Sequence, residues 1–276
     1  MENKRVLIIN DVTGYGKVSS FAMVPIVSAY GHHPYVLPTA LVSNTMDYGS
    51  SIIFDTSQFI KESISKWKEY GFSFPVIATG LINTEDQIDT ICSFVEYQKP
   101  EFLMVDPIMA DDGKLYPGMN PDSVKYYKKL IALSDLIIPN YTEAIMLTGR
   151  YSGRDALTDN EYYELINSLK EIGAKNIVIT GCIEHNQHFN LIYDSTIDRI
   201  ERIGYDYIPV TLIGTGDVFS AALLSNIMNG HNLTDAVKSA DNFVRKVVEE
   251  NRNCDDHYDI YIEHTIQEVI NEIRQR

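Results

Sequence analysis

The sequence predicts an α/β protein with a central, mostly parallel sheet and helices on both faces. Short, continuous apolar runs such as RVLII at 5–9 and NIVIT at 176–180 alternate with longer amphipathic stretches. Such runs are typical of parallel strands that are buried on both faces. No repeat or long linker divides the 276 residues, so we expect a single domain over residues 1–276.

The expected elements follow from apolar periodicity and from turn and cap residues. Extended segments are expected at 5–9, 34–38, 40–43, 76–79, 102–105, 135–138 and 176–180. Residues 188–203 are expected to form an antiparallel hairpin that turns near Asp194-Ser195. Helices are expected at 57–69, 85–98, 159–172, 216–229, 233–250 and 265–275, with a short one that ends at Gly149. Thr84, with Gln87 three residues on, predicts a capping box for the helix at 85–98.

Charge and composition exclude some partners. The net charge of −15 repels phosphate backbones and anionic lipid, so neither nucleic acid nor a membrane is expected as a partner. ATP remains compatible, because backbone N–H groups and Mg²⁺ can hold a triphosphate in an acidic protein. The N-terminal segment MENKRVLIIN lacks the long apolar stretch of a signal peptide, which predicts a cytoplasmic protein.

Polar or small residues follow five of the expected strands. Asn10, Gly80, Asp106, Asn140 and Thr180 each lie at or just past the end of an apolar run. In open parallel sheets, ligands bind beyond the carboxyl ends of the strands. We therefore expect these five residues to line one edge of the sheet, in one crevice.

The most specific motif is the turn Gly214-Thr215-Gly216-Asp217 before the helix at 216–229. A glycine-rich turn that opens a helix leaves several backbone N–H groups and the positive end of the helix dipole directed at one point. This arrangement can stabilise a phosphoryl group, and Asp217 can accept the proton of an attacking hydroxyl. The alternative is that Asp217 only caps the helix.

Two further acidic sites fit a magnesium ion. Asp106-Pro107 follows the FLMV strand, and Glu143 lies on the first turn of the helix after Asn140. Mg²⁺ prefers a few carboxylates and retains several waters. The alternatives are an ordinary turn aspartate and an ordinary glutamate at a helix start.

The segment from Asn10 to Lys17 is a candidate substrate-binding loop. It lacks the Walker A spacing. As a dinucleotide fingerprint it gives Gly14-x-Gly16-x-x-Ser19, without the third glycine. We expect a mobile loop that binds substrate, with Lys17 or Lys114 offering positive charge to phosphates.

Together these residues resemble the ribokinase-like (PfkB carbohydrate kinase) superfamily. The GTGD turn at 214–217 resembles its anion hole and catalytic base, and Asn140 to Glu143 resembles its NxxE magnesium motif. The segment LPTALVSNTMDYG at 37–49, with its Ser-Asn pair and following tyrosine, is similar to pyridoxal (pyridoxamine) kinases, as is Asp106-Pro107.

The resemblance implies a three-layer α/β/α fold and ATP-dependent phosphorylation of the 5′-hydroxymethyl group of a vitamin B6 vitamer. The implied base is Asp217, in the anion hole of Gly214, Thr215 and Gly216. Mg²⁺ is expected near Asp106 and Glu143, and ATP along Asp106, Asn140, Glu143 and Thr180. The implied substrate-binding residues are Asn10, Ser43, Met46, Asp47 and Tyr48. The resemblance also implies a homodimer and is compatible with a monovalent cation.

The chain departs from pyridoxal kinases where the pyridine ring is expected. Asn10-Asp11 replaces Ser-His, Leu81 replaces a tyrosine, and Met46-Asp47 replaces Thr-Gly or Thr-Gln. Hydroxymethylpyrimidine kinases of thiamin synthesis share the fold and bind a similar ring, so they are the nearest alternative. Two alternatives of other classes are a non-catalytic ligand-binding protein on a kinase fold and a nicotinamide-dependent oxidoreductase.

Overall fold

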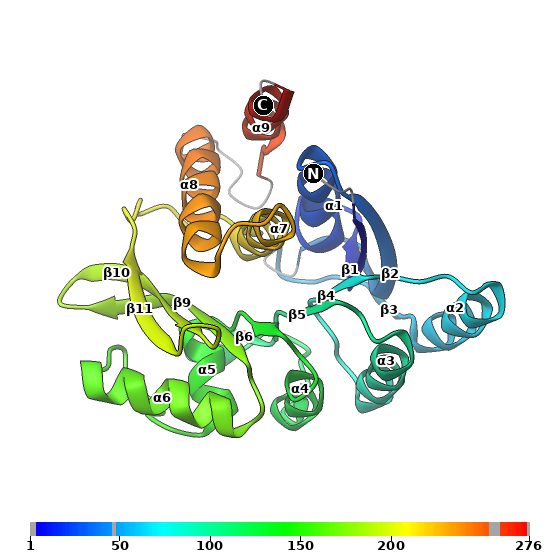
Figure 1. Cartoon of the computed structure of the whole chain (residues 1–276), viewed down its shortest axis with the longest axis horizontal. Coiled ribbons are helices and arrows are strands. Elements are labelled where there is room, and N and C mark those ends of the chain that lie inside the picture. Colours follow the sequence, from blue (N-terminus) through cyan, green and yellow to red (C-terminus); the bar gives the residue numbers. More distant parts are fainter. Residues whose placement is uncertain (1–3, 46–47, 254–259, 275–276) are drawn as a thin grey trace. The chain divides into compact units, whose positions relative to one another are not determined.

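The computed structural model describes residues 4–45, 48–253 and 260–274. The chain forms two compact units, the first from residues 1–78 with 207–276 and the second from residues 79–206. Most of their elements are labelled in Figure 1. Each unit combines parallel strands with packed helices, which confirms the predicted α/β class. Among the described residues, none of the helices has the length and apolar character that crossing a membrane requires.

The strands of the first unit have the order β4-β1-β2-β3. Strand β1 (Arg5–Thr13) pairs in parallel with β2 (His33–Val42), and β2 pairs antiparallel with β3 (Ile53–Asp55). Strand β4 (Val76–Thr79) gives its first three residues to this unit. The central run of β1, residues 6–9, is fully buried, as its continuous apolar sequence predicts.

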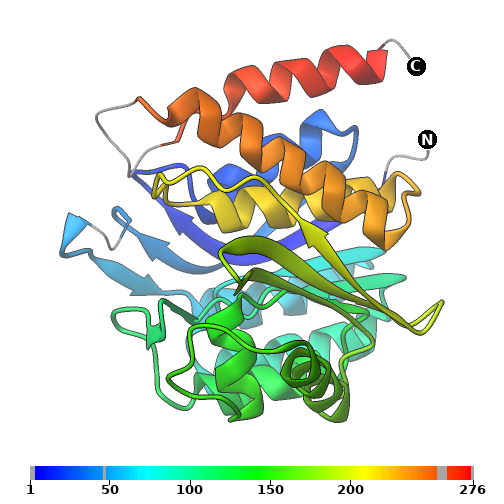
Figure 2. The same ribbon diagram turned by 90° about the vertical axis from the view of Figure 1, so that its left-hand side faces the viewer.

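Among the residues that the structure describes, five helices belong to the first unit. They are α1 (Ser19–Ala29), α2 (Ser57–Tyr70), α7 (Thr215–Met228), α8 (Leu233–Asn251) and α9 (Glu263–Arg274). Helix α7 packs between α1 and α8, and α9 lies against α1 and α8 (Figure 2). Helix α7 is covered by neighbours on several sides, and its side chains are accordingly apolar around nearly the whole helix. Its N-terminal turn faces β1 and the start of α1.

The second unit has the strand order β11-β10-β9-β8-β5. Its strands are β5 (Phe102–Val105), β8 (Leu136–Ile137), β9 (Asn176–Glu184), β10 (Gln187–Asp194) and β11 (Arg199–Gly204). Strands β5, β8 and β9 are parallel, and β9, β10 and β11 form an antiparallel meander. The last two of these confirm the hairpin predicted at 188–203.

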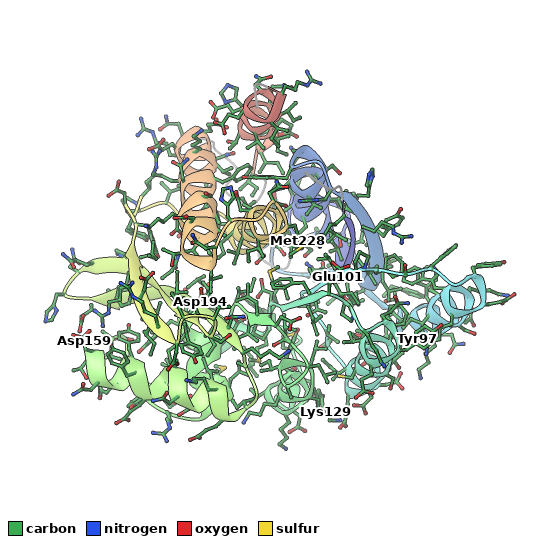
Figure 3. The ribbon with its side chains drawn as sticks, viewed as in Figure 1. Tyr97, Glu101, Lys129, Asp159, Asp194 and Met228 are labelled. Carbon is green, nitrogen blue, oxygen red and sulfur yellow. The ribbon has the colours of Figure 1, made fainter. Side chains whose placement is uncertain are left out.

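The helices of this unit are α3 (Glu85–Gln98), α4 (Ser123–Ile131), α5 (Tyr141–Thr148) and α6 (Asp159–Glu171). A small separate hairpin joins β6 (Ala110–Asp111) to β7 (Lys114–Leu115). Helices α3 and α4 pack side by side, and Lys129 on α4, labelled in Figure 3, bonds Glu85 and Asp89 of α3 at 2.8 and 2.7 Å.

Several expectations need correction. Strand β1 continues past Asn10 to Thr13, because Val12 and Thr13 pair with Leu41 and Val42. The segments expected at 34–38 and 40–43 are one strand, β2. Thr84 caps α3 as predicted, but Gln87 accepts from the amide of Asn83, one residue before the cap.

Candidate active site

The turn before α7 requires glycine at position 214. Gly214 is the N-cap of the helix, with φ 91°. A Cβ at this position would lie 2.7 Å from the Lys17 carbonyl oxygen and 3.0 Å from Cγ1 of Val18. At Gly216, by contrast, a Cβ would meet no atom within 4 Å. The first turn of α7 is therefore packed closely on its Gly214 side and open at Gly216.

Asp217 lies in this first turn and does not cap the helix. Its Oδ2 accepts the backbone N–H of Ser19 at 2.7 Å, and its Oδ1 accepts Nδ2 of Asn10 at 3.2 Å. Both donors come from outside α7, one from the start of α1 and the other from β1. The carboxylate is thus held in place by neighbouring elements, and the first-turn amides of α7 have no side-chain cap.

The surroundings of Asp217 make it a stronger base than an ordinary aspartate. Loss of hydration raises the pKa of its carboxyl to about 7, and the negative charge of Asp11 adds to the increase. The hydrogen bonds from Ser19 and Asn10 act in the opposite direction. A carboxylate with a pKa near neutrality suits general base catalysis.

Asn10 is fully buried, and its amide is oriented by its neighbours. Its Oδ1 accepts the backbone N–H of Asp11 at 3.0 Å, which leaves Nδ2 to donate to Asp217. The pairing of β1 with β2 is irregular between Asn10 and Val12. The structure thus brings two of the predicted site residues, Asn10 and Asp217, into direct contact.

The predicted substrate segment after β2 packs on the glycine loop after β1. The amide of Gly14 donates to the Val42 carbonyl at 2.7 Å, and the amide of Thr45 donates to the Tyr15 carbonyl at 3.1 Å. Ser43 donates its hydroxyl to Oδ1 of Asn44 at 2.6 Å. Met46 and Asp47, which were also predicted to bind substrate, lie outside the described residues.

Two exposed tyrosines meet where these segments join. The rings of Tyr15 and Tyr48 are edge to face, with centroids 5.6 Å apart, and the side chains are 54% and 41% exposed. Tyr48 was predicted as a substrate residue, whereas Tyr15 was not singled out. An aromatic residue between two glycines, Gly14 and Gly16, was the signal available in the sequence.

In the second unit, Glu143 is only 2% exposed and its carboxylate is used by the backbone. Oε1 accepts the amides of Met109 and Ala110 at 2.9 and 3.3 Å, and Oε2 accepts the amide of Asn140 at 2.9 Å. With Asn140 it forms a capping box for α5. Burial and the negative charge of Asp106 raise the pKa of the Glu143 carboxyl, and the amides oppose this.

Three further contacts tie the β6–β7 hairpin and β9 to the start of α5. Nδ2 of Asn140 donates to the Ala110 carbonyl at 2.7 Å, and the Gly113 amide donates to the Thr142 hydroxyl at 3.0 Å. Asn140 also pairs with Thr180 in a parallel bridge. Asp106, Asn140, Glu143 and Thr180 therefore belong to one connected region of this unit, and Thr142 is a member that the sequence analysis missed.

The acidic residues near this region fit a hydrated divalent cation better than a fully coordinated one. Across the described ranges, no cluster of three or more His, Cys, Asp or Glu side chains forms a metal cage. Asp106 and Glu143 are two carboxylates that repel each other, and both oxygens of Glu143 already accept amides. Mg²⁺ that keeps several waters is compatible with such a pair.

The two lysines expected near phosphates differ in their surroundings. Lys17 pairs with Glu263 and lies over the Tyr261 ring, with Nζ 5.3 Å from the centroid. Lys114 is exposed on the β6–β7 hairpin. In this structure the charge of Lys17 therefore serves to hold the C-terminal segment against the glycine loop.

The chain is similar to known kinases over most of its length. Residues 24–260 match the family described as phosphomethylpyrimidine kinase. Pyridoxine kinase of Bacillus subtilis is 26% identical over 186 residues, which cover 65% of this chain and 66% of that one. Hydroxymethylpyrimidine/phosphomethylpyrimidine kinase of Aquifex aeolicus is 23% identical over 192 residues, which cover 68% and 72%.

A solved structure from Bacteroides thetaiotaomicron, crystallised with pyridoxal, has a TM-score of 0.92. It is 26% identical, and the match covers 97% of this chain and 96% of that one. The match over residues 24–260 spans both compact units and contains Asn140, Glu143 and Asp217. The chain therefore belongs to the phosphomethylpyrimidine kinase family, as a kinase with a ribokinase-like α/β fold.

Proposed function

We propose that this protein transfers the γ-phosphoryl group of ATP to the 5′-hydroxymethyl group of a vitamin B6 vitamer, with Asp217 as the base. The observation that carries this proposal is the placement of Asp217. It lies on the first turn of α7, it does not cap the helix, and its pKa is about 7. A capping aspartate would bond its own helix, whereas this carboxylate is held by Asn10 and Ser19.

Each group of residues has one role in this proposal. Asp217 accepts the proton of the alcohol as its oxygen attacks the γ-phosphorus, and ADP leaves. The amides of Gly214, Thr215 and Gly216 stabilise negative charge on the transferred group. Tyr15, Ser43, Asn44 and Tyr48 bind the ring, and Met46 and Asp47 remain predicted contacts.

The second unit supplies the proposed nucleotide residues. Asp106, Asn140, Glu143 and Thr180 would bind the triphosphate, and Mg²⁺ would lie near Asp106 and Glu143. When bound, Mg²⁺ neutralises charge on the phosphate oxygens. Because the amides of Met109, Ala110 and Asn140 already occupy the Glu143 carboxylate, we propose that Glu143 acts on the metal through water and through the shape of the loop.

The direct test is ADP release by the purified protein with Mg-ATP and, separately, pyridoxal, pyridoxine, pyridoxamine and hydroxymethylpyrimidine. The proposal predicts release with at least one B6 vitamer at a higher kcat/KM than with hydroxymethylpyrimidine. Release with hydroxymethylpyrimidine alone would assign the enzyme to thiamin synthesis. Absence of release with all four would mean that the departures at Asn10, Asp11 and Leu81 have changed the substrate, and would contradict the proposed B6 vitamer.

Hydroxymethylpyrimidine kinase is the second candidate, and two observations favour it. The matching family is described as phosphomethylpyrimidine kinase, and the Aquifex aeolicus relative phosphorylates a hydroxymethylpyrimidine by name. The chain also carries Asn10-Asp11 where pyridoxal kinases usually have Ser-His. The pyridoxal in the Bacteroides thetaiotaomicron structure, and the Ser43-Asn44 pair with Tyr48, favour the B6 vitamer.

The pH dependence of turnover follows from the pKa of Asp217. The base must be ionised, so kcat/KM is expected to fall about tenfold per pH unit below pH 7 and to level off above it. A series of initial rates from pH 5 to pH 9 measures this limb. A profile that stays flat down to pH 5 would contradict the assignment of Asp217 as the base.

Replacing Glu143 by Gln is expected to weaken both the fold and ATP binding. The amide NH₂ group would face a backbone N–H that now donates to the carboxylate, which costs about 1–3 kcal/mol of the free energy of unfolding. We also expect a higher KM for ATP, because the loop at Met109–Ala110 loses an anchor. Thermal unfolding and ATP kinetics measure both effects, with the exposed Glu171→Gln as a control. If Glu143→Gln left both the unfolding temperature and the KM for ATP unchanged, the proposed role of Glu143 in holding the loop and binding ATP would be contradicted.

We also propose a homodimer through the edge at β3. Strand β3 ends the strand order of its unit, and its surroundings are apolar and exposed. Ile52 is 78% exposed and Phe54 is 65% exposed. Exposed apolar side chains at an unpaired strand edge promote association between chains, so such an edge is unusual in a monomer. Phe54→Lys is expected to halve the molar mass measured by light scattering, whereas Tyr97→Lys on α3 should not change it. An unaltered mass for Phe54→Lys would exclude this edge as the interface.

A further inference from the structure

Tyr127 is a fully buried residue to which the proposed reaction assigns no role. It lies on α4, on the helix face that also buries Ser123, Leu130 and Ile131. A buried phenol hydroxyl is costly to the fold unless it has hydrogen-bond partners, and an apolar side chain of similar size would fill the same space without that cost. The partners of this hydroxyl therefore indicate what the tyrosine stabilises.

The Tyr127 hydroxyl bonds three backbone groups in two loops of the second unit. It accepts the amide of Ile82 at 2.9 Å, and its proton is shared between the carbonyl oxygens of Gly80 and Ile108, at 2.8 and 3.2 Å. Gly80 and Ile82 belong to the loop after β4, and Ile108 belongs to the loop after β5. One side chain from α4 thus joins both loops beyond the carboxyl ends of these strands, where ligands bind in open parallel sheets.

The peptide group between Ile108 and Met109 connects Tyr127 to Glu143. A trans peptide group is planar, so its C=O and N–H point in opposite directions and move together. Its C=O belongs to Ile108 and accepts the hydrogen bond from Tyr127 at 3.2 Å. Its N–H belongs to Met109 and donates to Oε1 of Glu143 at 2.9 Å. One rigid group is therefore held by Tyr127 on one side and by Glu143 on the other.

The next backbone groups of this loop are bonded to the start of α5. The Ala110 amide donates to Oε1 of Glu143 at 3.3 Å, and the Ala110 carbonyl accepts Nδ2 of Asn140 at 2.7 Å. Met109 and Ala110 are fully buried. The contact from Tyr127 comes from a different helix, α4. Loss of the hydroxyl would therefore free the loop from α4 and loosen the peptide that positions the Glu143 carboxylate.

We propose that Tyr127 is a positioning residue for nucleotide binding, which fixes the Glu143 carboxylate through the Ile108–Met109 peptide. Groups that orient a carboxylate near a metal ion change the metal affinity when they are removed, although they do not touch the metal. This inference rests on the proposed role of Glu143 toward Mg²⁺. It adds to the site a residue that acts through backbone groups, from a helix that carries none of the predicted motifs.

Tyr127→Phe removes the hydroxyl and keeps the buried ring. Hydrogen exchange of the Met109 amide, measured by NMR of the ¹⁵N-labelled protein without nucleotide or metal, reports on the peptide itself. We expect this amide to exchange about tenfold faster in the variant, beyond any change in the slowest amides of β9, which report on global unfolding. Tyr97→Phe on α3, where the side chain is exposed, is the control and should leave both rates unchanged. If Met109 and β9 accelerate by the same factor, Tyr127 contributes stability alone and the inference is overturned.

Binding of a non-hydrolysable ATP analogue separates an effect on the metal from an effect on the fold. Calorimetry gives its Kd with Mg²⁺ and, separately, with EDTA in place of Mg²⁺. We expect Tyr127→Phe to weaken binding about tenfold with Mg²⁺ and to leave it nearly unchanged with EDTA. A wild-type Kd with Mg²⁺, or equal losses in both buffers, would overturn the inference. These titrations contain no alcohol, so a magnesium-specific loss in a protein that phosphorylates none of the B6 vitamers would support the inference and overturn the proposed function.

A double-mutant cycle tests the connection through the peptide. Because Tyr127 and Glu143 act on one peptide group, Tyr127→Phe combined with Glu143→Gln should bind the magnesium complex of the analogue no more weakly than Glu143→Gln alone. Losses that multiply in the double variant would mean that Tyr127 acts by another route, such as its bonds to Gly80 and Ile82, and would overturn the proposed connection.

Discussion

Replacing Asp217 by Asn is expected to lower kcat about a thousandfold, with little change in the KM for ATP. The asparagine side chain can still accept one of the hydrogen bonds from Ser19 and Asn10, so the site keeps its shape. It cannot take a proton from the attacking alcohol. The measurement is steady-state turnover with the preferred alcohol at pH 8, where the wild-type carboxylate is ionised.

The same variant should be more stable than the wild type at alkaline pH. The folded-state pKa of Asp217 is about 7 and its ordinary value is 3.8, so between these values the folded state binds more protons than the unfolded state. The free energy of unfolding of the wild type therefore falls as the pH rises through this window. The stability advantage of Asp217→Asn should grow between pH 5 and pH 8, by about 1–2 kcal/mol after allowance for solvent exposure.

Asp206→Asn serves as the control for both measurements, because Asp206 is exposed. Near-normal turnover in Asp217→Asn would mean that Asp217 is not the catalytic base. Loss of turnover together with a lower melting temperature at pH 8 would mean that the variant had lost its fold, and the kinetic result would then carry no weight for the mechanism.

Two glycine substitutions in one turn should have opposite effects on stability. Gly214→Ala is expected to destabilise the protein by about 2–4 kcal/mol, because its Cβ would lie 2.7 Å from a backbone oxygen at a residue with φ 91°. Gly216→Ala should keep or slightly raise the stability, because its Cβ meets no atom and alanine favours the helix.

Activity should nevertheless fall in both variants. In Gly216→Ala the new methyl group would occupy the open side of the turn, where the transferred phosphoryl group is proposed to bind. Thermal unfolding and turnover of the two purified variants distinguish packing from function at this turn. If Gly216→Ala were fully active, the open side of the turn would not be the phosphoryl site.

Much of the fold could be predicted, because most strands are continuous apolar runs and most helices are amphipathic. Helix α1 was missed because it is apolar on several sides and contains Pro25, so it carries no helical period. Strand β3 was missed because it is three residues long and exposed. Both elements are stabilised by tertiary packing, and a local sequence pattern carries no information about such packing.

The candidate site was predicted where the chemistry depends on side-chain type, and missed where it depends on the backbone. Asn10 and Asp217 were both predicted, and the structure joins them by a hydrogen bond. The role of Ser19 depends on an amide aimed by a left-handed φ, for which the sequence holds no signature. The carboxylate of Glu143 was predicted from the NxxE motif, but its three amide donors come from a loop 33 and 34 residues away and from the start of its own helix.

The central claim is that an alcohol receives a phosphoryl group from ATP with Asp217 as the base. The most direct test is ³¹P NMR and mass analysis of the products formed from Mg-ATP and pyridoxal, pyridoxine or pyridoxamine, with wild type and Asp217→Asn side by side. The account predicts a 5′-phosphate ester and an equal amount of ADP from the wild type, and almost none from the variant. A phosphate ester formed equally fast by both proteins, or ADP released without any ester, would contradict it.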